Sequence, residues 1–295
     1  MKTAQLTVAL VQHRCHKTPE ENLETLEKGI RSAGREGAKL VLLQELHNYP
    51  YFCQTEETRF FDLAEAIPGA TTERLARLAK ELQLVIVASL FERRAAGVYH
   101  NTAAVLDTDG SLAGCYRKMH IPDDPGYHEK FYFTPGDLGF TPIDTSIGRL
   151  GVLICWDQWY PEAARLMALA GAELLLYPTA IGWDDRDDEA EQRRQFGAWR
   201  TIQQAHAIAN GLPVLCCNRT GIESTEDGSA SIHFWGGSFI AGPQGEILAE
   251  APHNADHVLV TPLDMRHSEE IRRIWPYFRD RRIDAYGDLT LRFRD

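Results

Sequence analysis

The sequence predicts an α/β protein in which a mixed β-sheet is covered by helices. Short apolar runs of strand length alternate along the chain with longer segments of helical periodicity, and this alternation is typical of α/β folds. The segments 102–118 and 236–251 instead place two strand-like runs around a turn, which predicts antiparallel hairpins. Parallel strands joined by helices, together with antiparallel hairpins, indicate a mixed sheet.

The first half of the chain opens with an apolar-rich strand, residues 5–12. Thr18 is a capping residue and Pro19 suits a first helical position, so a helix begins there, and it ends near Gly37. The next predicted elements are a strand at 39–46, a helix at 71–82 and a strand at 84–92. The first hairpin then turns at Asp109–Gly110, a dipeptide that favours tight turns.

The second half repeats the alternation. Strands are predicted at 148–156, 173–180, 213–220 and 257–264, and helices at 161–171 and 189–210. The second hairpin turns around Pro243–Gly245. No internal repeat, low-complexity segment or linker divides the sequence, so we expect a single domain over residues 1–295, with a basic and aromatic C-terminal tail (about 266–295) extending from it.

The charge balance argues against some classes of partner. The net charge is −11, from 31 Lys and Arg against 42 Asp and Glu, which disfavours binding to nucleic acid or to an anionic membrane. No apolar stretch approaches the ~20 residues needed to cross a bilayer. The first residues lack the pattern of a signal peptide, and the six cysteines are scattered without a CxxC spacing. We therefore expect a cytoplasmic protein with reduced thiols.

Several common catalytic motifs are missing from the sequence. It has no phosphate-binding loop, no dinucleotide-binding GxGxxG after a strand, no HExxH and no GxSxG. The 11 histidines show no metal-ligand spacing. The motifs therefore do not point to a metal site or a nucleotide site.

Three predicted strands carry a polar residue at or just after their end. These are Glu45, Lys118 and Cys155, and each alone could be structural: a carboxylate or amine in solvent, or a buried thiol. Together they form a complete chemical set, with a thiolate nucleophile, a carboxylate base, and an ammonium that stabilises both thiolate and oxyanion. The backbone N–H of Trp156, next to the thiol, is a second candidate oxyanion donor.

Three segments, LVLLQEL, YRKMHIPDDPGYHEKFYFTPGD and GVLICWDQWYPEAAR, resemble the signature regions of the nitrilase (carbon–nitrogen hydrolase) superfamily. The resemblance implies a catalytic triad of Glu45, Lys118 and Cys155, with Glu129 as a supporting glutamate. It also implies a four-layer α-β-β-α sandwich of two mixed β-sheets and a homodimer or higher homo-oligomer. No cofactor or metal is implied.

Within the superfamily, HIPDDPGYHEKFYFTPGD, LLLYPTAIG and YFRDRRID most resemble a branch that acts in polyamine biosynthesis. Its substrate is a mono-substituted urea with a four-carbon primary amine, which is hydrolysed to the diamine, carbon dioxide and ammonia. The cationic end needs an acidic or aromatic partner. The candidates are Asp123, Asp124, Asp184, Asp185, Tyr127, Trp156 and Trp183. Asp123 is preferred because it lies five residues after Lys118. At Trp183 the sequence differs from the pattern of this branch, which has a small polar residue there, so the preferred chain length or end group of the substrate stays open.

Other functions remain open from the sequence. A β-ureidopropionase, a carbamoyl-amino-acid hydrolase or an ω-amidase of the same superfamily would bind a carboxylate at the far end of its substrate. Such an enzyme needs an arginine there, and Arg186 or Arg219 could serve. A nitrilase-like module that binds without catalysis is the alternative from another class.

Overall fold

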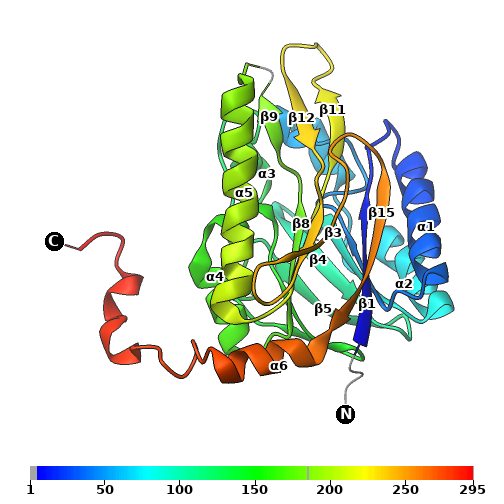
Figure 1. Ribbon diagram of the computed structural model, residues 1–295. Coiled ribbons are helices and arrows are strands. Elements are labelled where there is room, and N and C mark those ends of the chain that lie inside the picture. The colour runs from blue at the N-terminus through cyan, green and yellow to red at the C-terminus, as the bar shows by residue number, and fades with distance from the viewer. Residues whose placement is uncertain (1–4, 185, 295) are drawn as a thin grey trace.

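The computed structural model describes residues 5–184 and 186–294, and two six-stranded sheets dominate it (Figure 1). The first sheet has the strand order β15-β1-β2-β3-β4-β5. Its strands are β1 (Gln5–Gln12), β2 (Leu40–Leu43), β3 (Val85–Ala95), β4 (Val98–Leu106), β5 (Leu112–Arg117) and β15 (His257–Asp264). β1, β2 and β3 are mutually parallel, while β4, β5 and β15 pair antiparallel to their neighbours, so the sheet is mixed.

The second sheet has the order β14-β13-β10-β8-β7-β6 and is also mixed. Its strands are β6 (Ile143–Thr145), β7 (Gly148–Val152), β8 (Leu174–Thr179), β10 (Val214–Asn218), β13 (Phe239–Ala241) and β14 (Ile247–Glu250). A small third sheet, β11-β12-β9, was not predicted. It comprises β9 (Gly182–Asp184), β11 (Thr220–Ser224) and β12 (Ser231–Trp235).

Alternate residues of the first sheet enter two different cores. Val8, Leu10 and Leu42 face the core shared with the second sheet, whereas Ala9 and Val11 face the core beneath α1 and α2. Successive side chains of a strand point to opposite faces, so a strand buried on both faces is a nearly continuous apolar run. This explains why the middle of each of the segments 5–12 and 39–46 is a nearly continuous apolar run, although both strands belong to a layered structure.

Helices cover the outer face of each sheet, as the resemblance implied. α1 (Pro19–Arg35) and α2 (Ala70–Leu82) lie on the first sheet, and α4 (Pro161–Leu169) and α5 (Glu189–Asn210) on the second (Figure 1). The four-layer α-β-β-α sandwich is therefore confirmed. The alternation of strands and helices alone predicts a mixed sheet covered by helices. It does not predict that the strands form two separate sheets.

The two strands that precede the predicted catalytic residues Glu45 and Cys155 end at least three residues earlier than predicted. β2 stops at Leu43 rather than at residue 46, and β7 stops at Val152 rather than at residue 156. The apolar runs continue beyond the hydrogen-bonded ladders because the following turns are also buried. Cys155 consequently opens a 3₁₀ turn, Cys155–Trp159, instead of closing a strand.

The C-terminal segment begins with α6 (Met265–Ile274) and then leaves the sandwich (Figure 1). Apolar side chains along it are exposed, including Trp275 (52%) and Phe293 (81%). The short α3 (Glu129–Tyr132) lies instead within the loop that follows β5. None of the helices in the described ranges is both long and apolar enough to span a membrane.

Candidate active site

Residues that follow strands of both large sheets meet in the interior. Glu45 follows β2 and Lys118 follows β5 of the first sheet, while Cys155 follows β7 of the second. Lys118 Nζ donates to Glu45 Oε1 at 2.8 Å and to Glu129 Oε2 at 2.6 Å. The side chains of Glu45 and Lys118 are fully buried, and Glu129 and Cys155 are 1% and 5% exposed. The structure thus brings together all four residues that the resemblance named.

Lys118 is held as an ammonium by the two carboxylates. Burial alone would lower the pKa of Lys118, but the charges of Glu129 and Glu45 outweigh it and raise that pKa well above the ordinary value. Burial also raises the pKa of Glu129 to about 7, although Lys118 opposes the shift. Tyr51 supports this arrangement, because its hydroxyl donates to Glu129 Oε1 at 2.6 Å. No sequence motif pointed to Tyr51.

The backbone around Glu45 is fixed by a buried arginine. Arg219, between β10 and β11, donates through Nη2 to the carbonyl oxygens of Glu45 (3.1 Å) and Leu46 (2.7 Å). It also forms an ion pair with Glu223 at 2.8 Å, so its charge is compensated. On the side chain of Glu45, Oε1 accepts a bond from Asn101 at 2.7 Å in addition to the one from Lys118. Oε2 is buried with no hydrogen-bond partner in the described structure, and is left available to a proton.

The turn that carries Cys155 is strained and is held by Asp157. Cys155 has a φ of +41°, in the left-handed region that non-glycine residues seldom adopt. Asp157, which is fully buried, accepts bonds from the backbone N–H of Ile154 (2.9 Å) and the hydroxyl of Tyr116 (2.7 Å). Its other oxygen accepts the backbone N–H of His120 at 3.0 Å. Both sides of the nucleophile candidate are therefore anchored.

The thiol of Cys155 is protonated at rest. Burial raises its pKa well above the ordinary value, the charge of Glu45 raises it further, and Lys118 only partly opposes this. The sequence had suggested that the ammonium would favour the thiolate, and in the structure burial outweighs that effect. The Sγ–H contacts the carbonyl oxygen of Ala180 at 3.8 Å. Reaction at this sulfur therefore requires a base that removes the proton.

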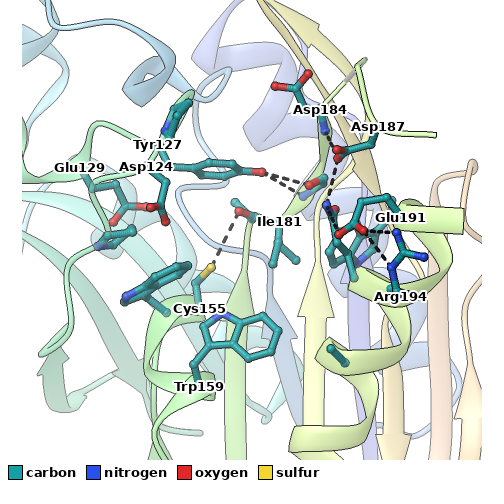
Figure 2. Close-up of a pocket in the computed structure, with 18 residues that line it drawn as sticks. Asp124, Tyr127, Glu129, Cys155, Trp159, Ile181, Asp184, Asp187, Glu191 and Arg194 are labelled. Carbon is teal, nitrogen blue, oxygen red and sulfur yellow. Dashed lines mark hydrogen bonds and ion pairs between the residues drawn. The ribbon is translucent and has the colours of Figure 1, made fainter. Parts of the chain in front are cut away.

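A pocket of about 530 Å³ opens onto Cys155 and Glu129 (Figure 2). Its volume lies in the usual range for small-molecule sites. Its lining residues include Tyr127, Trp156 and Asp184 from the predicted substrate-binding set, but not Asp123 or Trp183. Asp123 is exposed, and the indole N–H of Trp183 donates to the carbonyl oxygen of Gln192 at 3.1 Å. Asp185 lies outside the described residues.

The wall opposite Cys155 carries Asp184, which is among the predicted substrate-binding residues, and three charged residues that are not. Figure 2 shows Asp184, Asp187, Glu191 and Arg194 together on that side of the pocket. They come from β9, from the connection that follows it and from the beginning of α5. The only signal in the sequence was the acidic stretch around residues 184–191, which has no fixed spacing to any motif. Within the described ranges, no group of three His, Cys, Asp or Glu residues is placed to hold a metal ion.

A comparison with protein families decides the classification. Residues 7–273 match the family described as carbon-nitrogen hydrolase. The chain belongs to the carbon–nitrogen hydrolase family. This hydrolase also resembles a solved structure, the carbon–nitrogen hydrolase from Helicobacter pylori G27, with a TM-score of 0.96 and 50% identity over 98% of this chain and 100% of that one.

Curated relatives cover the hydrolase almost completely. An N-carbamoylputrescine amidase from Solanum lycopersicum is 46% identical over 98% of this chain and 96% of that protein. A citrullinase from Francisella tularensis is 43% identical over 98% of this chain and 100% of that protein. The match to the superfamily and to the amidase branch expected from the motifs is thereby confirmed.

Proposed function

We propose that this hydrolase cleaves N-carbamoylputrescine to putrescine, carbon dioxide and ammonia, with Cys155 as the nucleophile. The observation that carries the proposal is one pocket with two unlike ends. Cys155 and Glu129 line one end, with Lys118 and Glu45 bonded behind them, and an acidic wall forms the other end. The 46% identity to the amidase from Solanum lycopersicum supports the same substrate.

In the first half of the proposed reaction, Cys155 Sγ attacks the ureido carbon while its proton passes to Glu45. The carbonyl oxygen becomes negative and is stabilised by Lys118, which has three N–H groups and uses two on carboxylates. The backbone N–H of Trp156 is the second proposed donor. When the tetrahedral intermediate collapses, the C–N bond to the terminal nitrogen breaks. Ammonia leaves with the proton that Glu45 had taken.

In the second half, water cleaves the S-carbamoyl enzyme. Glu45 accepts one proton from the water and returns it to the sulfur as the C–S bond breaks. The released carbamate loses carbon dioxide and leaves putrescine. Glu129 holds Lys118 in place, and the hydroxyl of Tyr51 in turn orients Glu129.

The rest of the pocket suits the remainder of this substrate. Trp159, Ile181 and Ala198 supply apolar lining for a four-carbon chain. Five carboxylates line the pocket, on Asp124, Glu129, Asp184, Asp187 and Glu191, whereas Arg194 is the single arginine or lysine among the lining residues. This excess of negative charge favours a substrate whose far end is an ammonium. Tyr127 and Trp156 add aromatic faces close to the thiol.

A carbamoyl amino acid such as citrulline is the second candidate substrate. Arg194 lines the pocket, and a guanidinium is the usual partner of a substrate carboxylate. The citrullinase from Francisella tularensis, at 43% identity, points the same way. Arg219, considered from the sequence, is occupied in the interior by Glu223 and backbone carbonyls.

Ammonia release measured in parallel on N-carbamoylputrescine, citrulline, N-carbamoyl-β-alanine and succinamate tests the proposal. We expect the highest kcat/KM on N-carbamoylputrescine, because the acidic wall repels a free carboxylate. Activity confined to the three acids would refute the polyamine substrate and leave the family assignment intact. A lack of hydrolysis on all four, with a folded protein, would support a binding module instead.

We further propose that the protein forms a homodimer or larger homo-oligomer. The C-terminal segment leaves the sandwich with Trp275, Ile283 and Phe293 exposed, and Leu166 and Leu169 of α4 are also exposed. Sedimentation at micromolar concentration should show association, and a chain ending at Arg273 should associate more weakly. A full chain that sediments as a monomer would contradict this.

We also propose that the protein acts in the cytoplasm, since all six cysteines are free thiols in the structure.

A further inference from the structure

The acidic wall of the pocket contains three carboxylates in different electrostatic situations. Asp184 belongs to β9, Asp187 lies between β9 and α5, and Glu191 belongs to the first turn of α5. Figure 2 shows all three across the pocket from Cys155. A substrate held at Cys155 by its ureido group would bring its far end to this wall, past Ile181 and Trp159.

Two of these carboxylates are already neutralised by arginines. Asp184 accepts two side-chain bonds from Arg186, at 2.7 and 2.5 Å, and this pairing lowers the pKa of Asp184 to about 2. Glu191 accepts two from Arg194, at 2.9 and 2.5 Å, both at Oε2. Asp184 would have to break a bidentate pair before it could bind a substrate ammonium directly, and the negative charge of Glu191 is already shared with Arg194.

Asp187 has only uncharged donors. Its Oδ2 accepts bonds from the side-chain amide of Gln195 at 3.0 Å and from the backbone N–H of Asp184 at 3.3 Å. Within the described part of the chain no cation is paired with it. Both donors bond the same oxygen, so Oδ1 has no hydrogen-bond donor in the described structure, and Asp187 lines the pocket. Asp187 is therefore a positioned carboxylate at the distal end that no arginine or lysine of the described structure contacts directly, although the charge of Arg186 lies near it.

Asp124 is the other lining carboxylate without an ion-pair partner in the described structure, and it lies elsewhere. It is exposed on the loop that leads to Tyr127 and Glu129, at the same side of the pocket as the thiol (Figure 2). An ammonium separated from the ureido carbon by a four-carbon chain extends away from that side. The position of Asp124 thus suits the reactive end, and that of Asp187 the distal end.

We infer that Asp187 binds the distal ammonium of the substrate, and that the Glu191–Arg194 pair denies the pocket a free guanidinium for a substrate carboxylate. This inference rests on the proposed function and identifies the residues that set its specificity. Gln195 is a positioning residue, because its amide bridges Asp187 Oδ2 and Glu191 Oε1, the latter at 3.3 Å. The pocket consequently prefers a diamine-derived urea to a zwitterionic one.

The test compares Asp187→Asn with the unchanged protein on N-carbamoylputrescine and on N-butylurea, which has the same chain without the amine. We expect kcat/KM on N-carbamoylputrescine to fall about tenfold or more through KM, since a charge-assisted bond is lost. The kcat/KM of the variant on N-butylurea should stay within about twofold of that of the unchanged protein, and this result would show that the fold and the chemistry are intact.

A second variant, Glu191→Gln, removes the carboxylate that is paired with Arg194. It should raise kcat/KM on citrulline relative to kcat/KM on N-carbamoylputrescine.

The outcomes separate this inference from the function on which it rests. If the unchanged protein does not hydrolyse N-carbamoylputrescine, the proposed function fails. If it does, and Asp187→Asn loses nothing or loses equally on both ureas, Asp187 does not bind the ammonium. A larger selective loss in Asp124→Asn would move the ammonium site to Asp124 and overturn the inference.

Discussion

Replacing Cys155 with alanine should abolish ammonia release and leave the fold intact. The proposed reaction forms a covalent bond to this sulfur, and the 3₁₀ turn offers no other nucleophile in its place. Loss of a nucleophile typically costs about 10⁴-fold or more in kcat. Because Cys155 packs within the core between the sheets, alanine leaves only a small cavity. The measurement is ammonia release on N-carbamoylputrescine, with a thermal melt to verify folding.

Cys115→Ala is the matched control for that variant. Cys115 lies half-buried on β5, pairs in register with Ala104, and is distant in sequence from each proposed catalytic residue except Lys118. It should retain nearly full kcat. If Cys155→Ala kept more than about one hundredth of the original rate, the covalent mechanism would be refuted.

Glu45→Gln should lower kcat by about 10²- to 10⁴-fold, the usual contribution of a general base. The resting thiol is protonated because burial raises its pKa, so attack depends on a proton acceptor. Glutamine has the same shape, and its carbonyl oxygen can still accept the bonds from Lys118 and Asn101. Its amide nitrogen would then replace Oε2, which has no partner among the described residues. The loss should therefore appear in catalysis far more than in folding.

Steady-state kinetics and thermal melts of Glu45→Gln distinguish these effects. Glu24→Gln on the exposed face of α1 is the matched control, since among the described residues Glu24 forms a single, long ion pair, 3.9 Å, to Lys28. That control should behave like the unchanged protein. A Glu45→Gln variant with more than about a tenth of the original kcat would show that another group accepts the thiol proton.

Much of the fold could be predicted because local signals and tertiary structure agree. β1, α5 and β15 begin and end at the predicted residues. In α5 the capping residue Asp188 accepts a bond from the backbone N–H of Glu191, and Gly211 ends the helix with a φ of +58°. The hairpin at Asp109–Gly110 also lies where its turn residues indicated.

The site could be predicted only where a motif marked it. Glu45, Lys118, Glu129 and Cys155 lie within contiguous signature segments, and the structure brings these four residues together. Tyr51 and Asp187 contribute from loops whose sequence has no such pattern. Their roles depend on which loops the two sheets bring together, and strand periodicity does not encode that. The catalytic and binding roles stay predictions until the variants are measured.

Arg219 ties the two halves of the sandwich at the point where chemistry is proposed to occur. It belongs to the connection after β10 of the second sheet, yet its guanidinium donates hydrogen bonds to the two peptide carbonyls that follow β2 of the first sheet. Any slippage of one sheet over the other would displace the base relative to the sulfur. Catalytic activity should therefore depend on the correct packing of the two sheets against each other. A partly unfolded molecule in which each sheet is intact but the two are no longer packed together should have no activity.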